Sequence, residues 1–286
     1  MMRNASKALL LLAILVAFIA FYARYIEPYH LTTRQLTVNH QNAPFGYEEI
    51  TIAVFSDTHF GPYYTLENFE NVKSVINSKN PDIILFCGDL IDNYNEYDGD
   101  TIAISSALAK LNAKIGKYAI FGNHDHGGGA FRAYNDIMKA GGFTVFINDF
   151  IEFPELNLTL TGLDDFIFGK ASTDTAALAP ENSYNILFCH EPDIADLILP
   201  YNIDFMTAGH THGGQISLPG YKHVFFPAYG QKYLKGSYSF ENDRQTLLYV
   251  NSGIGMTKLP FRFMARAEVT FITITNPEAP FQKQSR

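Results

Sequence analysis

The sequence predicts an α/β domain in which two β-sheets face each other with helices outside. Short apolar runs alternate with amphipathic stretches in the first half of the chain, which is the rhythm of strand, helix, strand. Further apolar runs follow in the second half with few long helices between them, and two sheets accommodate that many strands. The 286 residues, 47% hydrophobic and 17% charged, exclude a disordered or collagen-like chain and fit one large domain plus an extra segment.

An apolar segment near the amino terminus predicts insertion into a membrane. No charged residue occurs between Ala8 and Ala23, and basic residues flank the run on both sides. As a helix these residues reach about 24 Å, short of a ~30 Å hydrocarbon core unless the next two residues extend the span. A cleavable signal peptide is the alternative, but bulky Phe21 and Tyr22 stand where cleavage needs small residues. The pattern favours an uncleaved anchor over 1–26 and does not fix which side of the membrane holds the domain.

A linker and first strand over 27–49 are expected to lead into the main domain, 50–286. Alternating polar and apolar residues predict a strand at 34–40, and a loop containing Pro44 and Gly46 would return the chain into an apolar strand at 50–55. Together these two strands predict a β-hairpin that opens the domain.

The alternation of helices and strands continues along the chain. Apolar residues recur at helical spacing from Leu66 to Ile76 behind Thr65 as the N-cap, and Pro81 ends that helix. Further helices are expected at about 100–113 and from Ala130 to a Gly-Gly pair at 141–142. Strands are expected at 82–87, 118–121, 158–161, 185–189, 205–208, 246–250 and 268–275.

Polar residues follow five of the predicted strands at the point where each strand ends. They lie in the segments Asp57-Thr-His59, Gly88-Asp89, Gly122-Asn123-His124-Asp125, His190 and Gly209-His210-Thr-His212. The carboxyl ends of strands converge on one edge in α/β folds, so these loops can meet although they span most of the chain. We expect them to form a single site.

The residue types in these segments predict a metal site. Two carboxylates, one amide and four imidazoles, without a thiolate, suit borderline metals such as Mn, Fe or Zn. Seven such side chains exceed what one ion normally takes from protein, but they suffice for two divalent ions that share a carboxylate. Taken singly, each residue could be a buried polar group that satisfies a loop backbone. Together, seven desolvated ligand-type groups without a metal would be costly.

The acidic charge balance argues against a nucleic-acid partner. Twenty-one Lys and Arg against 29 Asp and Glu give a formal charge of -8, and no basic run stands out. Two divalent ions add four positive charges, which brings -8 to -4 and allows an acidic protein to hold an anionic substrate. With only Cys87 and Cys189, a disulfide scaffold is excluded.

In this order the motifs resemble those of the calcineurin-like metallophosphoesterase superfamily, over Ile52 to His212. The carboxyl-terminal part of the chain resembles the membrane-anchored bacterial branch of this superfamily. Three segments carry this resemblance: the block at 209–216, the Asn-Ser-Gly-Ile-Gly segment from Asn251 and the Leu-Pro-Phe-Arg-Phe-Met-Ala-Arg run at 259–266. That branch includes phosphodiesterases and UDP-2,3-diacylglucosamine hydrolases of lipid A synthesis. The resemblance implies a four-layer sandwich, two mixed sheets flanked by helices, and a single pass through the bacterial cytoplasmic (inner) membrane.

The resemblance also implies a role for each motif residue. One ion would be held by Asp57, His59 and His212, the other by Asn123, His190 and His210, with Asp89 bridging them. A hydroxide between the ions would attack phosphorus. His124 would stabilise the phosphorane charge or protonate the leaving oxygen, and Asp125 would hold its tautomer. Glu191, where the branch more often has an amide or basic residue, bears on substrate preference.

The expected function is hydrolysis of a phosphodiester or pyrophosphate. An anchor keeps the site within reach of the bilayer, which favours a membrane or lipid-linked substrate such as a UDP-diacylglucosamine. A soluble-substrate phosphodiesterase, for example for cyclic nucleotides, is the alternative. A catalytically silent binding protein is disfavoured because no ligand of the motif set is lost.

Several residues near the motifs carry two interpretations. Asp92 and Asp165 are expected to cap helices or accept loop hydrogen bonds, and His126 to be solvated or to support the site. Arg262 and Arg266 would either reach a diphosphate or pair with surface acids. The lysine- and aromatic-rich stretch 221–235 is interpreted as a hairpin, with a contact to anionic headgroups as the alternative.

Overall fold

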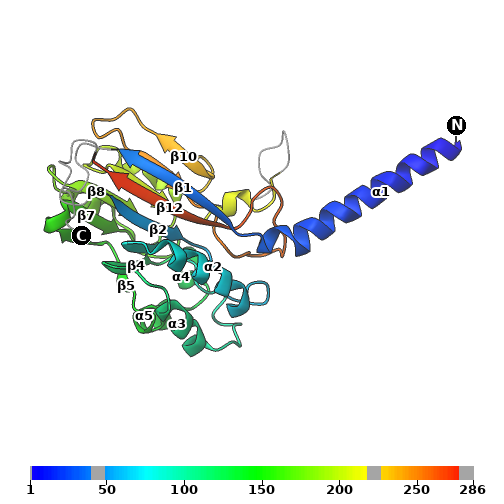
Figure 1. Ribbon diagram of the computed structural model, residues 1–286, viewed down its shortest axis with the longest axis horizontal. Helices are drawn as coiled ribbons and strands as arrows, with labels where there is room; N and C mark the ends of the chain where they lie inside the picture. The colour runs from blue at the N-terminus through cyan, green and yellow to red at the C-terminus, as the bar shows by residue number, and fades with distance from the viewer. Residues whose placement is uncertain (1, 40–48, 218–226, 277–286) are drawn as a thin grey trace, which may run out of the picture.

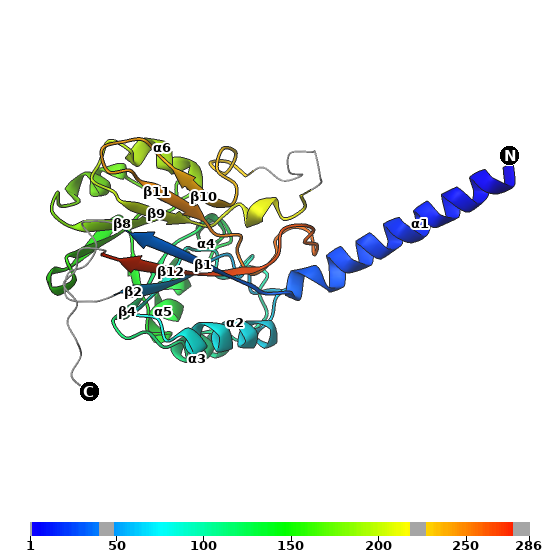
Figure 2. The ribbon, with the colours of Figure 1, turned by 45° about the horizontal axis from the view of Figure 1, so that its top comes forward.

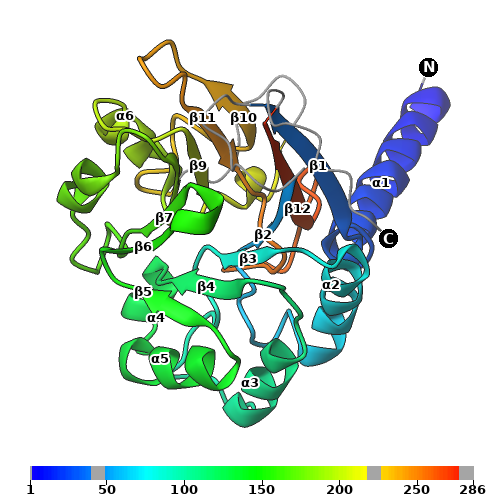
Figure 3. The same cartoon turned by 60° about the vertical axis from the view of Figure 1, so that its left-hand side comes forward.

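Two six-stranded sheets form the body of the computed structural model, which describes residues 2–39, 49–217 and 227–276 (Figures 1 and 3). One sheet has the order β1-β12-β2-β3-β4-β5 and the other β10-β11-β9-β8-β7-β6. The strands are β1 Thr32–Asn39, β2 Ile50–Phe55, β3 Ile83–Phe86, β4 Gly116–Ile120, β5 Thr144–Phe146, β6 Asp149–Phe153, β7 Leu158–Gly162, β8 Tyr184–Phe188, β9 Phe205–Ala208, β10 Gly236–Ser239, β11 Leu247–Val250 and β12 Glu268–Thr275.

The central strands of both sheets run parallel, so their carboxyl ends lie at one edge. In the first sheet β2, β3, β4 and β5 are parallel neighbours, and in the second β7, β8, β9 and β11 are. Antiparallel strands join the outer parts: β12 beside β2, β10 beside β11 and β6 beside β7. Both sheets are therefore mixed, as the family resemblance implies.

Alternation of side chains along β2 divides the interior into two cores. Ile52 and Val54 lie in the core between the two sheets, whereas Ala53 and Phe55 lie in the core that packs against helices. The helices on that side are α2 Leu66–Lys79, α3 Thr101–Ala109 and α5 Phe131–Ala140. The second sheet is flanked by the short α6, Ala195–Ile198, and by 3-10 turns (Figure 2). The predicted α/β sandwich with helices outside is confirmed.

Helix α1, Met2–Tyr25, extends away from the sandwich (Figures 1 and 2). Its apolar side chains are exposed from residue 8 to residue 21. At 1.5 Å per residue this helix is about 36 Å long, so it exceeds the ~30 Å hydrocarbon core that the uncharged run alone would not span. The segment from Asn4 to Tyr29 is long and apolar enough to cross a membrane. A 3-10 turn, Glu27–Tyr29, then leads into β1.

The predicted opening hairpin is wrong. β1 pairs in parallel with β12, with Thr32 opposite Glu268, and β12 pairs antiparallel with β2, with Thr270 opposite Val54. The last strand of the sheet therefore lies between the first two. An alternating pattern shows that a segment is a strand but contains no information about its partner. The loop expected at 41–46 lies outside the described residues.

Other boundaries differ from the predictions in smaller ways. Strands β5, β6 and β10 were not predicted, and α3 ends at Ala109 rather than near 113. The motif after β4 forms a short helix, α4 Asn123–Gly127. Of the stretch interpreted as a hairpin, residues 221–226 lie outside the described part, and 227–235 form turns without a strand.

Candidate active site

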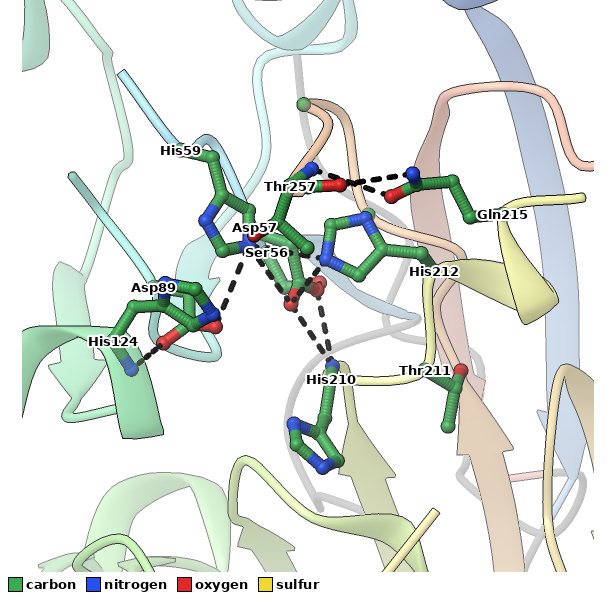
Figure 4. A network of polar contacts seen from close by, with 12 residues as sticks. Ser56, Asp57, His59, Asp89, His124, His210, Thr211, His212, Gln215 and Thr257 are labelled. Atoms are coloured by element: carbon green, nitrogen blue, oxygen red, sulfur yellow. Dashed lines mark hydrogen bonds and ion pairs between the residues drawn. The ribbon is translucent and has the colours of Figure 1, made fainter. Parts of the chain in front are cut away.

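Backbone hydrogen bonds tie the predicted motif loops to one another. The amide of Asp57 donates to the carbonyl of Gly88 (2.9 Å), which joins the loops after β2 and β3, and the amide of Gly209 donates to the carbonyl of His190 (3.0 Å), which joins those after β9 and β8. The two sheets meet where the amide of His210 donates to both carboxylate oxygens of Asp57, each at 3.1 Å (Figure 4). The five segments therefore lie at one place.

Glycines permit this close approach. A Cβ on Gly122 would collide with the carboxylate of Asp89, and a Cβ on Gly209 would collide with that of Asp57. The glycine that opens each of these two motifs thus leaves room for the carboxylate of another loop.

The backbone is strained at five of the seven predicted metal ligands. Non-glycine residues rarely adopt positive φ, and such conformations concentrate at functional sites. Here the positive φ values are 53° at Asp57, 44° at His59, 62° at Asp89, 72° at His210 and 52° at His212. The surrounding loops hold these residues in a conformation that their own preferences disfavour.

One group of ligand-type atoms consists of Asp57, His59 and His212. The Nε2 atoms of the two imidazoles lie 3.0 Å apart, and Nε2 of His212 lies 3.5 Å from Oδ1 of Asp57. The three ligand atoms lie within 4.8 Å of one another, and all three residues are buried. Oxygen and imidazole nitrogen at this spacing fit one borderline divalent cation.

A second group surrounds His190. Its Nε2 lies 3.2 Å from Oδ2 of Asp89 and 3.1 Å from Oδ1 of Asn123. The same Oδ2 of Asp89 lies 3.4 Å from Nε2 of His59, a member of the first group. The Asp89 carboxylate is thus placed between the two groups, where a shared ligand would stand.

Backbone carbonyls orient two of the imidazoles. Nδ1 of His190 donates to the carbonyl of Cys87 (2.6 Å), which leaves Nε2 as the ring nitrogen that faces Asp89. Nε2 of His210 donates to the carbonyl of Ala228 (2.8 Å), which leaves Nδ1 as the basic nitrogen of that ring. Such bonds fix the tautomer of a ligating histidine. The rings of His190 and His210 are 4.8 Å apart.

Part of the site is in the charge state that binds a cation. Burial lowers the pKa of His210 to about 3 and that of His212 well below its ordinary value, so both are neutral at pH 7. Burial alone would raise the pKa of Asp89, but the surrounding imidazoles, His190 foremost, hold it well below its usual range. Neutral imidazole and ionised carboxylate are the forms that ligate metals. Two other ligands favour the protonated form: burial alone would lower the pKa of His190, but Asp89 raises it well above its ordinary value, and burial raises the pKa of Asp57. Binding of divalent ions at these two residues would therefore release protons.

Asp92 orients two imidazoles, a role that sequence reasoning missed. Its Oδ1 lies 3.0 Å from Nδ1 of His59, and its backbone carbonyl accepts a hydrogen bond from Nδ1 of His124 (2.6 Å). An isolated bridge between Phe60 and Ile91 sets the two loops in register and so places Asp92 beside His59. The signal available in the sequence was its position three residues after Asp89 in the same loop.

The predicted role of Asp125 is corrected. Its carboxylate accepts hydrogen bonds from the amides of Asp89 (2.8 Å), Leu90 (2.9 Å) and Gly122 (2.9 Å). The imidazole of His124 is held by Asp92 instead. Burial raises the pKa of Asp125 to about 7. Because three backbone donors occupy its oxygens, Asp125 fixes the loop that carries Asp89 and does not set the tautomer of His124.

Two other neighbours of the motifs have structural partners. Nε2 of His126 lies 2.8 Å from Oδ1 of Asp164, and its ring stacks on Phe131. Asp165 accepts the amides of residues 167 to 169, as expected for a loop acceptor.

Arg262 is fully buried, which contradicts both of its predicted roles. Its guanidinium donates to the carbonyls of Gly255 (2.6 and 2.9 Å), Ser252 (3.0 Å) and Ala265 (2.8 Å). Its Nη2 also lies 3.3 Å from Nδ1 of His212. Arg262 reaches neither a surface acid nor the open cavity. No local sequence pattern predicts that an arginine will be buried in this way, because its hydrogen-bond partners are backbone carbonyls.

Arg262→Ala is expected to destabilise the protein strongly. It leaves several buried carbonyls without donors, at about 1–3 kcal/mol for each such group, so a loss of at least about 3 kcal/mol is expected. For a domain of this size that loss corresponds to roughly 6–12 °C in thermal midpoint. The matched control is Arg132→Ala, an exposed arginine on α5, with an effect within about 0.5 kcal/mol. Equal midpoints for the two variants would contradict the role given to Arg262.

A cavity of about 550 Å³ opens onto the two ligand groups. His124 lines it together with Asp89, Asp92, Asn123, His210 and His212. Exposed Phe168 and Lys258 also line it, one apolar and one cationic. Three carboxylates, those of Asp89, Asp92 and Glu96, line the same cavity, so an anionic substrate would depend on the charge of bound cations.

A buried cluster of carboxylates and imidazoles at the strand ends of a two-sheet α/β sandwich defines a class, the hydrolases that depend on divalent metal ions. The sequence pattern of the calcineurin-like phosphoesterases matches residues 50–214, more than half of the chain. The chain belongs to the calcineurin-like phosphoesterase family, and it is a metal-dependent hydrolase of phosphoesters.

Relatives are similar to the chain well beyond the motifs. An uncharacterized metallophosphoesterase of Bacillus subtilis, YkuE, is 40% identical over 257 residues, with 88% of each chain covered. An uncharacterized metallophosphoesterase of Aquifex aeolicus is 31% identical, with 87% of this chain and 94% of the relative covered. Phosphodiesterase YaeI of Escherichia coli is 28% identical, with 88% of this chain and 92% of the relative covered.

Proposed function

We propose that the chain is a membrane-anchored phosphoesterase with two metal ions, which hydrolyses a phosphodiester or pyrophosphate bond of a lipid-linked substrate such as UDP-2,3-diacylglucosamine. The observation that carries the proposal is the position of Asp89 between two ligand groups at a cavity that Phe168 and Lys258 also line. Residues 1–26 would be the anchor, 27–49 the linker and first strand, and 50–286 the catalytic domain.

The two ligand groups would hold the ions separately. Asp57, His59 and His212 would bind one, and Asn123, His190 and His210 the other, with Asp89 shared. When bound, two divalent ions of Mn, Fe or Zn supply a nucleophile at neutral pH and neutralise charge on the phosphoryl oxygens. The oxygen and imidazole donors around Asp89 are buried and would hold the ions in fixed positions.

His124 would act on the leaving group. It lines the cavity, and its amide donates to Oδ1 of Asp89 (2.8 Å), which fixes its position beside the ligand groups. Burial would lower the pKa of His124, but the charge of Asp89 and the bond to the Asp92 carbonyl raise it above its ordinary value. An imidazole that keeps its proton near neutral pH can give it to a leaving oxygen.

The exposed apolar helix α1 supports a lipid-linked substrate. A helix of this length and composition would hold the domain at the bilayer as a single-pass protein of the bacterial cytoplasmic membrane. A substrate that stays in the bilayer then meets the cavity without diffusing through water. Similarity to a phosphodiesterase favours a soluble phosphodiester as the second candidate.

The substrate is tested with the full chain in lipid vesicles with added Mn²⁺. We expect cleavage of UDP-2,3-diacylglucosamine, followed as release of uridine monophosphate, with kcat/KM at least about tenfold above that for bis(p-nitrophenyl) phosphate, because binding of remote substrate parts assists the reacting centre. Preference for the soluble diester or a cyclic nucleotide would assign the alternative. Inertness toward every phosphoester with Mn²⁺, Fe²⁺ and Zn²⁺ would contradict the catalytic proposal.

A further inference from the structure

The loop at 257–266 is tied to the foot of α1. The amide of Arg262 donates to the carbonyl of Ala23 in the last turn of the helix (2.9 Å). The amide of Ala265 donates to Oε1 of Glu27 (2.8 Å), and Glu27 is only 2% exposed. The loop is thus held against the point where the proposed anchor joins the domain.

The same loop reaches the mouth of the active-site cavity. Thr257 and Lys258 line that cavity. The side-chain amide of Gln215, three residues after His212, donates to the carbonyls of Thr257 and Leu259, each at 3.0 Å (Figure 4 shows the contact with Thr257). The loop therefore connects the foot of α1 with the ligand His212 and with the cavity lining.

Large apolar side chains of this loop point into solvent beside basic ones. Leu259 is 52% exposed and Met264 is 51% exposed. Lys258 and Arg266 are exposed next to them in sequence. Apolar residues that alternate with cations are typical of surfaces that lie at the boundary between headgroups and acyl chains.

A second cavity, of about 770 Å³, lies between the foot of α1 and this loop. Its lining includes Tyr22 of α1 and the exposed cations Arg34, Lys235 and Arg266. Two carboxylates, those of Glu27 and Glu268, also line it, but both are buried and bonded within the protein. Nε of Arg34 lies 3.9 Å from Oε2 of Glu268, and Nζ of Lys235 donates to the carbonyl of Met264 (3.1 Å). The three exposed cations outnumber the two carboxylates, and this excess of positive charge complements an anionic headgroup.

We propose that the loop 257–266 is a membrane-docking surface whose partner is the anionic headgroup layer of the bilayer that α1 enters. Leu259 and Met264 insert among the headgroups, and Lys258 and Arg266 contact phosphates. The mouth of the catalytic cavity then lies at the bilayer surface. This inference rests on the proposed anchoring by α1. The loop adds a second contact with the membrane, beside which a lipid-linked phosphoester would move from the bilayer to His124.

The chain contains no tryptophan, so single substitutions report on depth. We would reconstitute full-length Leu259→Trp and Met264→Trp in phosphatidylethanolamine and phosphatidylglycerol vesicles that carry brominated acyl chains. The control is Ile102→Trp, at a residue 75% exposed on α3. We expect at least about twofold quenching of the two loop tryptophans and none of the control, since bromine quenches only at short range. Quenching of the loop tryptophans no greater than that of the control would overturn the proposal.

A kinetic comparison separates docking from catalysis. The double variant Leu259→Glu, Met264→Glu is expected to lower kcat/KM for the vesicle-embedded substrate about tenfold and to leave hydrolysis of bis(p-nitrophenyl) phosphate unchanged. An equal loss on both substrates, or no loss on either, would overturn the docking role. Tryptophan quenching requires no turnover, so failure of the proposed activity would leave that test intact.

Discussion

Asp89→Ala is expected to lower kcat/KM for a phosphodiester at least about 1000-fold and to reduce the divalent metal content of the purified chain. The reason is geometric. Oδ2 of Asp89 lies 3.4 Å from Nε2 of His59 and 3.2 Å from Nε2 of His190, so its removal takes a donor from both ligand groups at once. Its other oxygen accepts the amide of His124, so the position of that residue is also released.

The measurements are metal content by elemental analysis and the rate of diester hydrolysis with saturating Mn²⁺. Asp136→Ala, an exposed aspartate on α5, is the matched control and should keep both metal and activity. Circular dichroism distinguishes loss of a ligand from loss of the fold. Full activity of Asp89→Ala with an unchanged metal content would contradict the shared position of this carboxylate.

His124→Ala is expected to lower kcat by about 10²- to 10⁴-fold while metal content stays near that of the wild type. His124 lines the cavity, and its bond to the carbonyl of Asp92 leaves Nε2 as the free ring nitrogen. His59, Asp92 and His124 also bring ligand-type atoms within 4.8 Å of one another, so the metal content of the variant decides between action on the substrate and binding of an ion. If the ring protonates the leaving oxygen, the loss will be larger for an alkyl leaving group than for p-nitrophenolate, which needs no proton. A loss that is the same for both leaving groups would assign His124 to stabilisation of charge at phosphorus.

Asp92→Asn provides the comparison for this variant. It keeps the backbone carbonyl that holds His124 but removes the charge next to Nδ1 of His59 (3.0 Å). A loss of about 10- to 100-fold is expected, and chiefly as weaker metal affinity, because the residue acts through a ligand rather than on the substrate. A metal-depleted His124→Ala protein would place His124 among the ligands and contradict the assignment.

The sequence predicted the location of the site better than the roles within it. The motifs at Asp57, Asp89 and His190 follow parallel strands, and the common edge of such strands brings them together whatever the loops do in detail. The exchange of roles between Asp92 and Asp125 was not predictable, because both follow a strand end at similar distance. Which carboxylate turns toward backbone amides and which toward imidazoles depends on loop conformation.

Long-range features were harder to predict than local ones. Residues 50–55 and 268–275 both read as strands, but the insertion of β12 between β1 and β2 depends on contacts separated by more than 200 residues. The burial of Arg262 could not be predicted either. A sequence motif of charged and apolar residues does not indicate that backbone carbonyls will surround a guanidinium group.

The parallel pairing of β1 with β12 bears on how a soluble fragment of this protein should be cut. The family match begins at residue 50, but a chain shortened to that point would lack β1. The backbone of β12 would then stand as an unprotected sheet edge eight residues long, open to pairing with another molecule. A fragment that begins just before Ala23 keeps that edge covered, and it also keeps Ala23 and Glu27, which accept hydrogen bonds from the loop at 257–266.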